Sequence, residues 1–226
     1  MARKQQSQGT CLFCGREMTK GGMSRHLPAC PERKQVIAKA EESGRPKEHL
    51  YHLRLQDAWG GEFWLDLEMR GSATLEALDR YLRAIWLECC GHLSEFAFQA
   101  WKDTIPMSRR VRDLFQPGME LVHLYDFGTT SETAIQVKAA REGAPLSDHP
   151  IFLMARNQPP SWRCMECDER ANWLCMECVY ELDKPGTLCD EHMDEHPHNA
   201  YGRPLPLVNS PRVGMCGYTG PAKPPY

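Results

Sequence analysis

The 226-residue chain has no apolar stretch approaching the roughly 18 residues that a membrane-crossing helix needs. Its first residues, Met1 to Gln8, are polar, and no apolar run of the kind found in secretion signals follows them. From these absences we expect a cytoplasmic protein with no membrane partner. In that reducing compartment, disulfides are not expected among the eleven cysteines, and the clustered cysteine pairs are expected to bind metal.

The usual catalytic fingerprints are also missing: the chain has no phosphate-binding GxxxxGK loop, no GxGxxG, no GxSxG and no HExxH. We therefore expect a protein that is not an enzyme. One alternative stays open, namely an active site in the middle of the chain that uses Asp126, His92 or His123.

Three of the eleven cysteines do not follow a spacing that is typical of metal ligands. Cys89 and Cys90 stand close to His92 and could form a thiol nucleophile, but we interpret them as small buried residues at the end of a helix. Cys216, in the last part of the chain, has no evident partner and is interpreted as a spare thiol.

The composition is that of a globular protein, with 42% hydrophobic residues, 25% charged residues and six tryptophans. The net charge of -3 is unevenly spread, because residues 1–47 carry ten Lys or Arg and only four Asp or Glu. Such a basic segment could contact nucleic acid, which the acidic remainder would repel. A solvated basic helix is the alternative explanation.

Periodicity predicts an α+β fold. Tyr51 to Leu55 and Phe63 to Met69 alternate apolar and polar residues, which indicates a hairpin with one buried face. Between Leu75 and Trp86 the apolar residues follow a helical period. Further strands are expected at 93–98, 120–125, 133–137 and 151–154, and a short exposed helix at 32–42.

We therefore expect a small antiparallel sheet with one main amphipathic helix, flanked by two small zinc-stabilised modules. The expected divisions are a zinc finger with its basic helix or linker, the central α+β domain, a two-zinc Cys/His module, and a Pro/Gly-rich tail with little regular structure. They cover residues 1–46, 47–158, 159–200 and 201–226.

The first ligand pattern is Cys11-x2-Cys14, eleven residues, then His26-x3-Cys30. A two-residue gap between cysteines forms a tight knuckle, and a three-residue gap places His26 and Cys30 on successive turns of a helix. This arrangement predicts a zinc finger. We expect an adaptor or accessory protein that binds protein or nucleic acid. The finger itself either contacts nucleic acid or is a purely structural or protein-docking knuckle, and the residues that could contact phosphates are Arg16, Lys20, Arg25, Arg33 and Lys34.

The second pattern contains eight ligands, enough for two tetrahedral zinc sites. If the pairs interleave, one ion is bound by Cys164, Cys167, Cys189 and His192, and the other by Cys175, Cys178, His196 and His198. The alternative is a single zinc bound by the two CxxC pairs. With either arrangement the segment is too small to fold without metal.

The spacing of this second pattern resembles that of B-box-type modules, which are compact protein-interaction units. Each predicted site offers four Cys or His ligands and leaves no position open for water, which disfavours zinc catalysis. We expect three Zn²⁺ ions in total. The pattern gives no indication of the oligomeric state.

The middle of the chain resembles the plasmid pRiA open-reading-frame-three-like family of bacterial and archaeal plasmids, chromosomes and insertion elements. The resemblance covers about residues 49–158 and is carried by Trp64 to Leu67, Thr74 to Leu78, Gly91 to Phe96 and, above all, Tyr125-Asp126-Phe127-Gly128. It implies an α+β fold, no established activity and a possible plasmid or mobile-element setting.

The chain departs from the family after Gly128, where Thr129, Thr130 and Ser131 replace the usual acidic residue and tryptophan. A binding site at this patch would therefore be altered. From the residues alone we interpret Asp126 as a carboxylate that caps a turn beside a glycine of positive φ.

Overall fold

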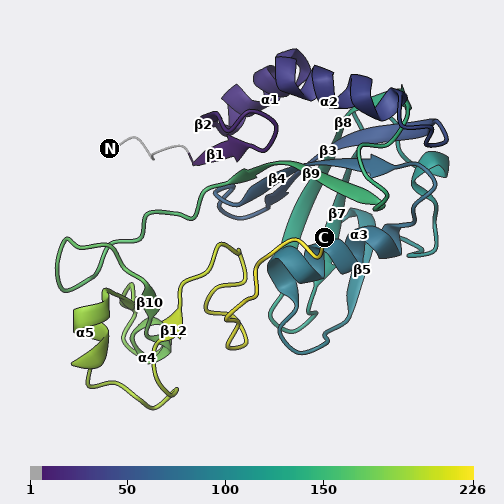
Figure 1. The fold of residues 1–226 in the computed structure, drawn as a ribbon. Coiled ribbons are helices and arrows are strands. Elements are labelled where there is room, and N and C mark those ends of the chain that lie inside the picture. The colour runs from purple at the N-terminus through teal and green to yellow at the C-terminus, as the bar shows by residue number, and fades with distance from the viewer. Residues whose placement is uncertain (1–6) are drawn as a thin grey trace.

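A nine-stranded, entirely antiparallel sheet forms the body of the computed structural model, which describes residues 7–226 (Figure 1). The first six residues of the expected finger segment, with the basic Arg3 and Lys4, lie outside the described residues. The strand order is β2-β1-β9-β4-β3-β8-β7-β5-β6. The strands are β1 Gln8–Cys11, β2 Glu17–Thr19, β3 Glu48–Asp57, β4 Trp64–Arg70, β5 Ser94–Gln99, β6 Lys102–Ile105, β7 Glu120–Tyr125, β8 Ser131–Gly143 and β9 Ile151–Asn157.

The expectation of a small sheet with one main helix is wrong, because the structure has a large nine-stranded sheet and a second, three-stranded one. The strands of the finger continue the sheet, because β1 pairs with β9 from Gly9↔Asn157 to Cys11↔Ala155. Without β1, the outer edge of β9 would expose a row of unpaired N–H and C=O groups. Strand β8 is also far longer than expected, since its charged second half pairs with β3 as far as Glu48↔Gly143.

Several expected elements are confirmed. Strands β3 and β4 form the predicted hairpin, in register from Leu50↔Arg70 to Gln56↔Trp64. The predicted amphipathic helix is α3, Leu75–Leu82, which continues as a π-helical turn, Arg83–Leu87. The predicted exposed helix is α2, Pro31–Glu41, and it follows the finger helix α1, Lys20–Ala29. A short 3₁₀ turn covers Val111–Asp113. Within residues 7–226, no helix combines the length and apolarity that a membrane span requires.

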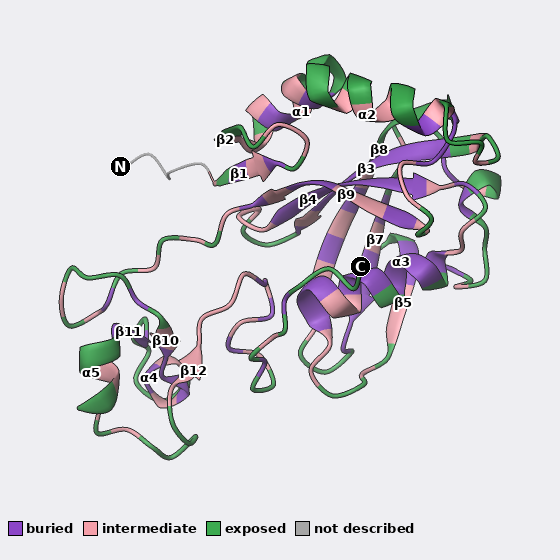
Figure 2. Cartoon of the chain, viewed as in Figure 1, coloured by how far each residue is buried: buried purple, intermediate pink, exposed green. Residues whose placement is uncertain are grey.

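The sheet is covered on both faces, with α1 and α2 on one side and α3 on the other (Figures 1 and 2). Strand β4 shows the consequence of period-two alternation. Leu65, Leu67 and Met69 join the main apolar core with α3. The intervening Asp66 and Glu68 lie on the opposite face and are also buried.

The face beneath α1 and α2 contains a layer of buried ion pairs. Asp66 accepts hydrogen bonds from His52 at 2.7 Å and from Arg54 at 2.6 Å. Glu68 accepts two hydrogen bonds from Arg141, at 2.8 and 2.9 Å. A buried carboxylate is tolerated only when it is paired in this way.

An apolar cluster attaches the finger to this same face. Met23 and Leu27 of α1 pack with Trp64, Met154 and Ala155 of the sheet, and all five side chains are buried. The finger is therefore part of the body of the protein rather than a mobile appendage.

A second, three-stranded sheet belongs to a separate C-terminal lobe (Figure 1). Its elements are β10 Trp173–Leu174, α4 Met176–Tyr180, β11 Thr187–Leu188, α5 Asp190–Asp194 and β12 Leu205–Pro206. The chain enters the lobe after Asn157 and leaves it before Asn209. The side chains of these two asparagines are hydrogen-bonded to each other at 2.8 Å.

The last part of the chain is irregular beyond β12, as expected, but it is packed on the main body. Ser210 and Arg212 are fully buried, and Ser210 donates a hydrogen bond to the carbonyl of Trp86 at 2.5 Å. Arg212 donates to the carboxylate of Asp126 and to the carbonyl of Thr129. Arg156 donates to the carbonyl of Asn209 at 2.5 Å. These contacts return the C-terminus to the neighbourhood of α3 (Figure 1).

Replacement of Gly9 by alanine should loosen the attachment of the finger. A Cβ at Gly9 would lie 2.4 Å from the Trp64 ring and 2.5 Å from the backbone oxygen of Arg156. We expect a loss of about 1–3 kcal/mol of unfolding free energy, measured by urea denaturation of the zinc-loaded protein. Gly21→Ala is the control, because a Cβ there meets nothing within 4 Å and alanine favours a helix. Equal stability of Gly9→Ala and the wild type would contradict the close packing.

Arg212→Ala should destabilise the body, because it leaves the carboxylate of Asp126 buried without its partner. We expect a loss of about 3 kcal/mol in the same denaturation assay. The control is Arg203→Ala, which removes a side chain that is 81% exposed and 3.5 Å from Asp194, and which should change stability by at most about 0.5 kcal/mol. Similar losses of unfolding free energy in the two variants would show that the buried Arg212–Asp126 pair stabilises the protein no more than an exposed pair does.

Candidate metal centres

Cysteine and histidine side chains gather into four clusters within residues 7–226, and each cluster could hold a metal ion. In every cluster the ligand atoms lie within 4.8 Å of one another. All eleven cysteines of the chain belong to these clusters. The clusters are Cys11, Cys14, His26 and Cys30; Cys89, Cys90, His92 and Cys216; Cys164, Cys167, Cys189 and His192; and Cys175, Cys178, His196 and His198.

The first cluster lies where β1, the turn after it and α1 meet. A tight turn closes the Cys-x2-Cys knuckle, with the Gly15 N–H donating to the carbonyl of Cys11 at 2.8 Å and Gly15 at φ 73°. Helix α1 places Nε2 of His26 at 3.3 Å from Sγ of Cys14. A tetrahedral zinc site has a sulfur-to-nitrogen separation of about 3.6 Å, so the side chains are close to a metal-binding arrangement.

Burial affects the protonation of this cluster. Cys11 and Cys30 are fully buried. Burial raises the pKa of the Cys11 thiol to about 11, and it also raises the pKa of Cys30. Since a metal binds the thiolate, a divalent ion entering here would release protons to the solvent.

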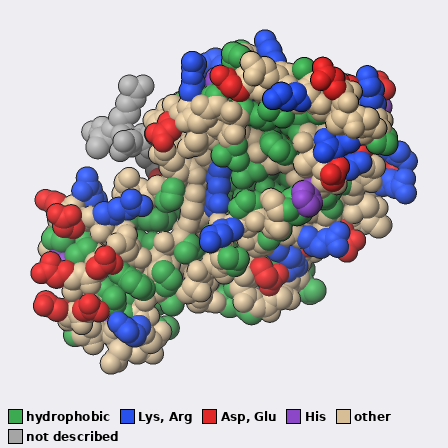
Figure 3. Space-filling model, in the orientation of Figure 1, with side chains coloured by type: hydrophobic (Ala, Val, Ile, Leu, Met, Phe, Trp, Pro, Cys, Tyr) green, Lys and Arg blue, Asp and Glu red, His purple; other side chains and the backbone are tan. Residues whose placement is uncertain are grey.

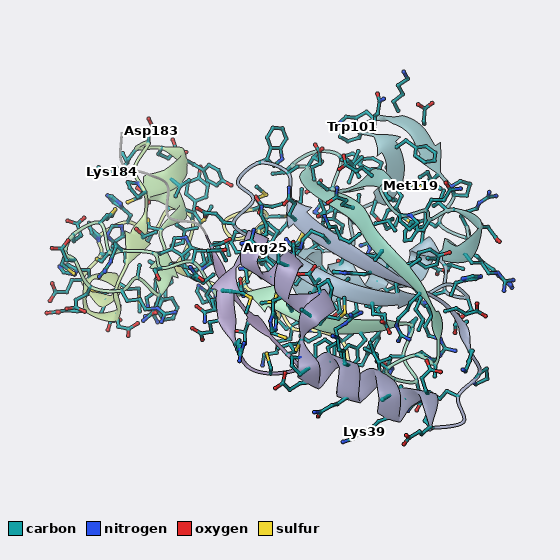
Figure 4. The ribbon with its side chains drawn as sticks, turned by 90° about the horizontal axis from the view of Figure 1, so that it is seen from above. Arg25, Lys39, Trp101, Met119, Asp183 and Lys184 are labelled. Atoms are coloured by element: carbon teal, nitrogen blue, oxygen red, sulfur yellow. The ribbon has the colours of Figure 1, made fainter. Side chains whose placement is uncertain are left out.

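The basic residues of the finger differ in their availability. Lys20 donates to the side chain of Gln56 at 2.8 Å, and Arg33 lies 3.8 Å from the buried Glu68. These two cations are therefore engaged within the protein. The other three residues that could contact phosphates are exposed, and Figure 4 labels one of them, Arg25; they are Arg16, Arg25 and Lys34.

The C-terminal lobe brings together the two interleaved ligand sets that the spacing predicts. In the first set, Nδ1 of His192 lies 3.5 Å from Sγ of Cys167 and 3.1 Å from Sγ of Cys189, and the two sulfurs are 3.9 Å apart. Cys164 completes this set. This distance between the two sulfurs agrees with the roughly 3.8 Å expected between two thiolates bound to one tetrahedral zinc ion.

The second set in the lobe is centred on Cys178, which lies 3.3 Å from Nε2 of His196 and 3.1 Å from Nδ1 of His198. Cys175 caps helix α4, and its sulfur accepts a hydrogen bond from the Cys178 N–H. The two CxxC pairs thus belong to different clusters. The structure does not assemble them into the single site that the alternative required.

Local hydrogen bonding gives the thiols of the lobe different acidities. Burial alone would raise the pKa of Cys164, but hydrogen bonds from the backbone of Cys189, Glu166 and Cys167 outweigh it and lower this pKa to about 7. Burial and the neighbouring Cys175 raise the pKa of Cys178 to about 11. In the same set as Cys164, a hydrogen bond from the Glu169 backbone lowers the pKa of Cys167, but burial and the neighbouring Cys164 and Cys189 outweigh it and raise this pKa to about 11. Both sites must therefore lose protons to bind metal.

Sequence reasoning missed the fourth cluster. The interpretation of Cys89 and Cys90 as buried is wrong, because Cys90 is exposed and Cys89 half-buried, and Cys216 is not a spare thiol. The close spacing of Cys89, Cys90 and His92 was a visible hint. Their fourth partner lies 124 positions beyond His92, so spacing alone could not identify it.

The residues of the alternative active site are not all together. Nε2 of His92 lies 3.4 Å from Oδ2 of Asp126. His123, in contrast, is fully buried and pairs with Asp79 at 2.7 Å. Burial lowers the pKa of His123, and its Nδ1 has no hydrogen-bond partner among residues 7–226, so this side chain is a neutral core residue.

Asp126 caps a turn as expected, since its Oδ1 accepts hydrogen bonds from the N–H groups of Gly128 and Thr129 at 3.0 and 3.2 Å. The positive φ of 65° belongs to Asp126 itself, however, and not to the glycine. Its second oxygen pairs with the buried Arg212, a partner from the far end of the sequence.

Comparison with known proteins identifies no family. No protein-family model matches the chain, and no curated protein matches it. One similar solved structure is that of a protein of unknown function, MM3350, from Methanosarcina mazei Go1, with 18% sequence identity and a TM-score of 0.39. The match covers 46% of this chain and 66% of that one, just under two thirds of its length. The resemblance to the plasmid pRiA open-reading-frame-three-like family stays a prediction.

Removal of metal should unfold the C-terminal lobe while the main sheet persists. The buried apolar side chains of the lobe are few, and half of them are ligands: Cys164, Ala171, Leu174, Cys175, Met176, Cys178, Leu188 and Cys189. With structural zinc contributing on the order of 10 kcal/mol, chelation should abolish amide protection in residues 162–198, measured by hydrogen exchange. Amides of β3, β4 and β8 are the internal control and should stay protected. Continued protection of the lobe after verified metal removal would contradict a structural role for the ions.

Proposed function

We propose that the protein is a zinc-binding, non-catalytic interaction protein that presents an acidic, metal-stabilised lobe to a basic protein partner. Cys/His clusters with four ligands each and no oxygen ligand suit zinc, which such sites bind in closed tetrahedral geometry. The single observation that carries the proposal is the interleaved pair of complete ligand sets within a lobe whose apolar core is small and half made of ligand cysteines.

The metals would act by fixing the shape of the lobe. Helices α4 and α5 have five residues each, and each strand of the small sheet has two. Elements this short are not stable alone in water. Two ions joined to ligands that interleave along the chain would hold both helices and the sheet in one arrangement.

The charge of the lobe supports a basic partner. Carboxylates gather over this part of the surface (Figure 3). Nine acidic side chains between residues 159 and 200 are exposed, against three exposed basic ones. The acidic set is Glu166, Asp168, Glu169, Glu181, Asp183, Asp190, Glu191, Asp194 and Glu195.

Zinc would not neutralise this surface. In the cluster of Cys164, three thiolates outweigh the two positive charges of one Zn²⁺ ion, which leaves a net negative site. An acidic lobe repels the phosphates of nucleic acid and attracts lysine- and arginine-rich segments. A basic protein segment is therefore favoured over DNA or RNA as the partner of the lobe.

The proposal is tested with the zinc-loaded full chain and two labelled probes, a twelve-residue peptide rich in Lys and Arg and a twelve-base-pair DNA duplex. We expect the peptide to bind, to weaken as salt is raised, and to bind about tenfold more weakly when Glu166, Glu191 and Glu195 are changed to Gln. The matched control changes three exposed carboxylates of the main body to Gln, namely Glu42, Glu76 and Glu142.

Several results would overturn the proposal. Equal weakening by the two sets of substitutions would mean that the lobe is not the binding surface. Tighter binding of the duplex than of the peptide would favour the basic finger as the interaction site. A purified protein in which the lobe clusters hold no zinc, measured by elemental analysis and native mass spectrometry, would remove the basis of the proposed function.

A further inference from the structure

We propose that Cys89, Cys90, His92 and Cys216 form a fourth zinc site, which fastens the C-terminal segment to the central domain and holds the most readily exchanged ion of the protein. This site is independent of the other three and of the proposed partner. The argument rests on the geometry of the cluster, the conformation of the backbone at its ligands, and the charged side chains beside it.

The distances between ligand atoms are close to those around a tetrahedral ion and are mostly somewhat shorter. Sγ of Cys90 lies 3.6 Å from Sγ of Cys89 and 3.4 Å from Sγ of Cys216. Nε2 of His92 lies 2.9 Å from Sγ of Cys90 and 3.5 Å from Sγ of Cys216. Zinc–ligand bonds of about 2.3 Å to sulfur and 2.0 Å to nitrogen place such atoms about 3.6–3.8 Å apart. A small outward adjustment, mainly of His92 from Cys90, would admit the ion.

The backbone on both sides is shaped to present these side chains. Gly91 has a φ of 76°, which lets the chain reverse between Cys90 and His92, and its N–H donates to Glu88 at 2.5 Å. Cys216 itself has a φ of 50°, in the left-handed region that side-chain-bearing residues rarely adopt. A strained residue of this kind persists where other contacts hold it, and here it directs the thiol of Cys216 to the cluster.

The surroundings suit a site with three thiolates. Three thiolates and one Zn²⁺ ion leave a net negative charge, and the buried guanidinium of Arg212 lies 3.5 Å from Sγ of Cys89. Arg212 is itself held by its ion pair with the carboxylate of Asp126. The hydroxyl of Tyr125 lies 3.7 Å from the Cys89 sulfur. Such partners around the ligands orient them and stabilise the bound ion.

Exposure distinguishes this cluster from the other three. Cys90 and Cys216 are exposed, whereas each of the other clusters has at least two buried ligands. Solvent and small chelators therefore reach the fourth ion directly. We expect it to exchange before the ions that the finger and the lobe would hold.

The ion would connect parts of the chain that are distant in sequence. Cys89, Cys90 and His92 follow the π-helical turn after α3, and Cys216 stands in the segment that returns from the C-terminal lobe. Buried residues of that segment already anchor it, including Ser210, which is bonded to the carbonyl of Trp86. The fourth ion would strengthen this attachment, because it would link Cys216 by metal coordination to the three ligands that follow α3.

The test counts zinc by native mass spectrometry under reducing conditions and follows its transfer to a chromogenic chelator. We expect four ions per wild-type chain, of which one transfers at least about tenfold faster than the others. Cys216→Ser should hold three ions and lack the fast phase, and hydrogen exchange at residues 214–218 should accelerate. Cys90→Ser, a second variant, should show the same loss.

Cys178→Ser is the matched control, because it removes a ligand of the lobe and should lose a slow ion while it keeps the fast phase. A wild type with three ions and no fast phase would overturn the fourth site and leave the proposed function intact. Four ions in Cys216→Ser would also overturn it. So would a Cys90–Cys216 disulfide found by peptide mapping in reducing buffer, since these sulfurs are close enough to bond after a small movement.

Discussion

Two buried carboxylates on β4, Asp66 and Glu68, constrain how the rest of the protein assembles. A charge removed from water is tolerated only with close partners of opposite charge. The partners of Asp66 and Glu68 all come from outside β4. His52 and Arg54 lie on the adjacent β3, and Arg141 lies on the second half of β8. The pairs therefore fix the order of the three central strands on one face, while the leucines on the other face pack against α3. The finger helices cover the ionic face, so the finger and the central sheet form one body.

The sequence predicted secondary structure best where the burial of one face of a single strand or helix produces a regular spacing of apolar residues. The hairpin and α3 follow from alternation and helical period, because each buries one regular face. The size of the sheet could not be predicted in this way. Strand β1 is short and contains Gly9, and only its contact with Trp64 and the backbone of β9 explains why a glycine is needed. The charged residues at the end of β8 lie outside the strand that was expected at 133–137, because the partners that hold them in the sheet lie on other strands.

The ligand sets show the same division between local and distant information. Spacings of one to three residues indicated twelve ligands, because side chains so close along the chain can reach one ion whatever the rest of the fold does. Cys216 meets Cys89, Cys90 and His92 only because Arg212 and Ser210 pack the returning segment on the body. A contact of this kind depends on tertiary packing, and no pattern in the segment itself reveals it.

The asparagine pair where the chain enters and leaves the C-terminal lobe has a consequence for how the protein can vary. Asn157 and Asn209 are joined side chain to side chain, so the intervening residues form an excursion whose two ends already touch. A brief turn between Asn157 and Asn209 could therefore replace the lobe without moving any strand of the nine-stranded sheet, so the lobe can vary in length while the body keeps its fold.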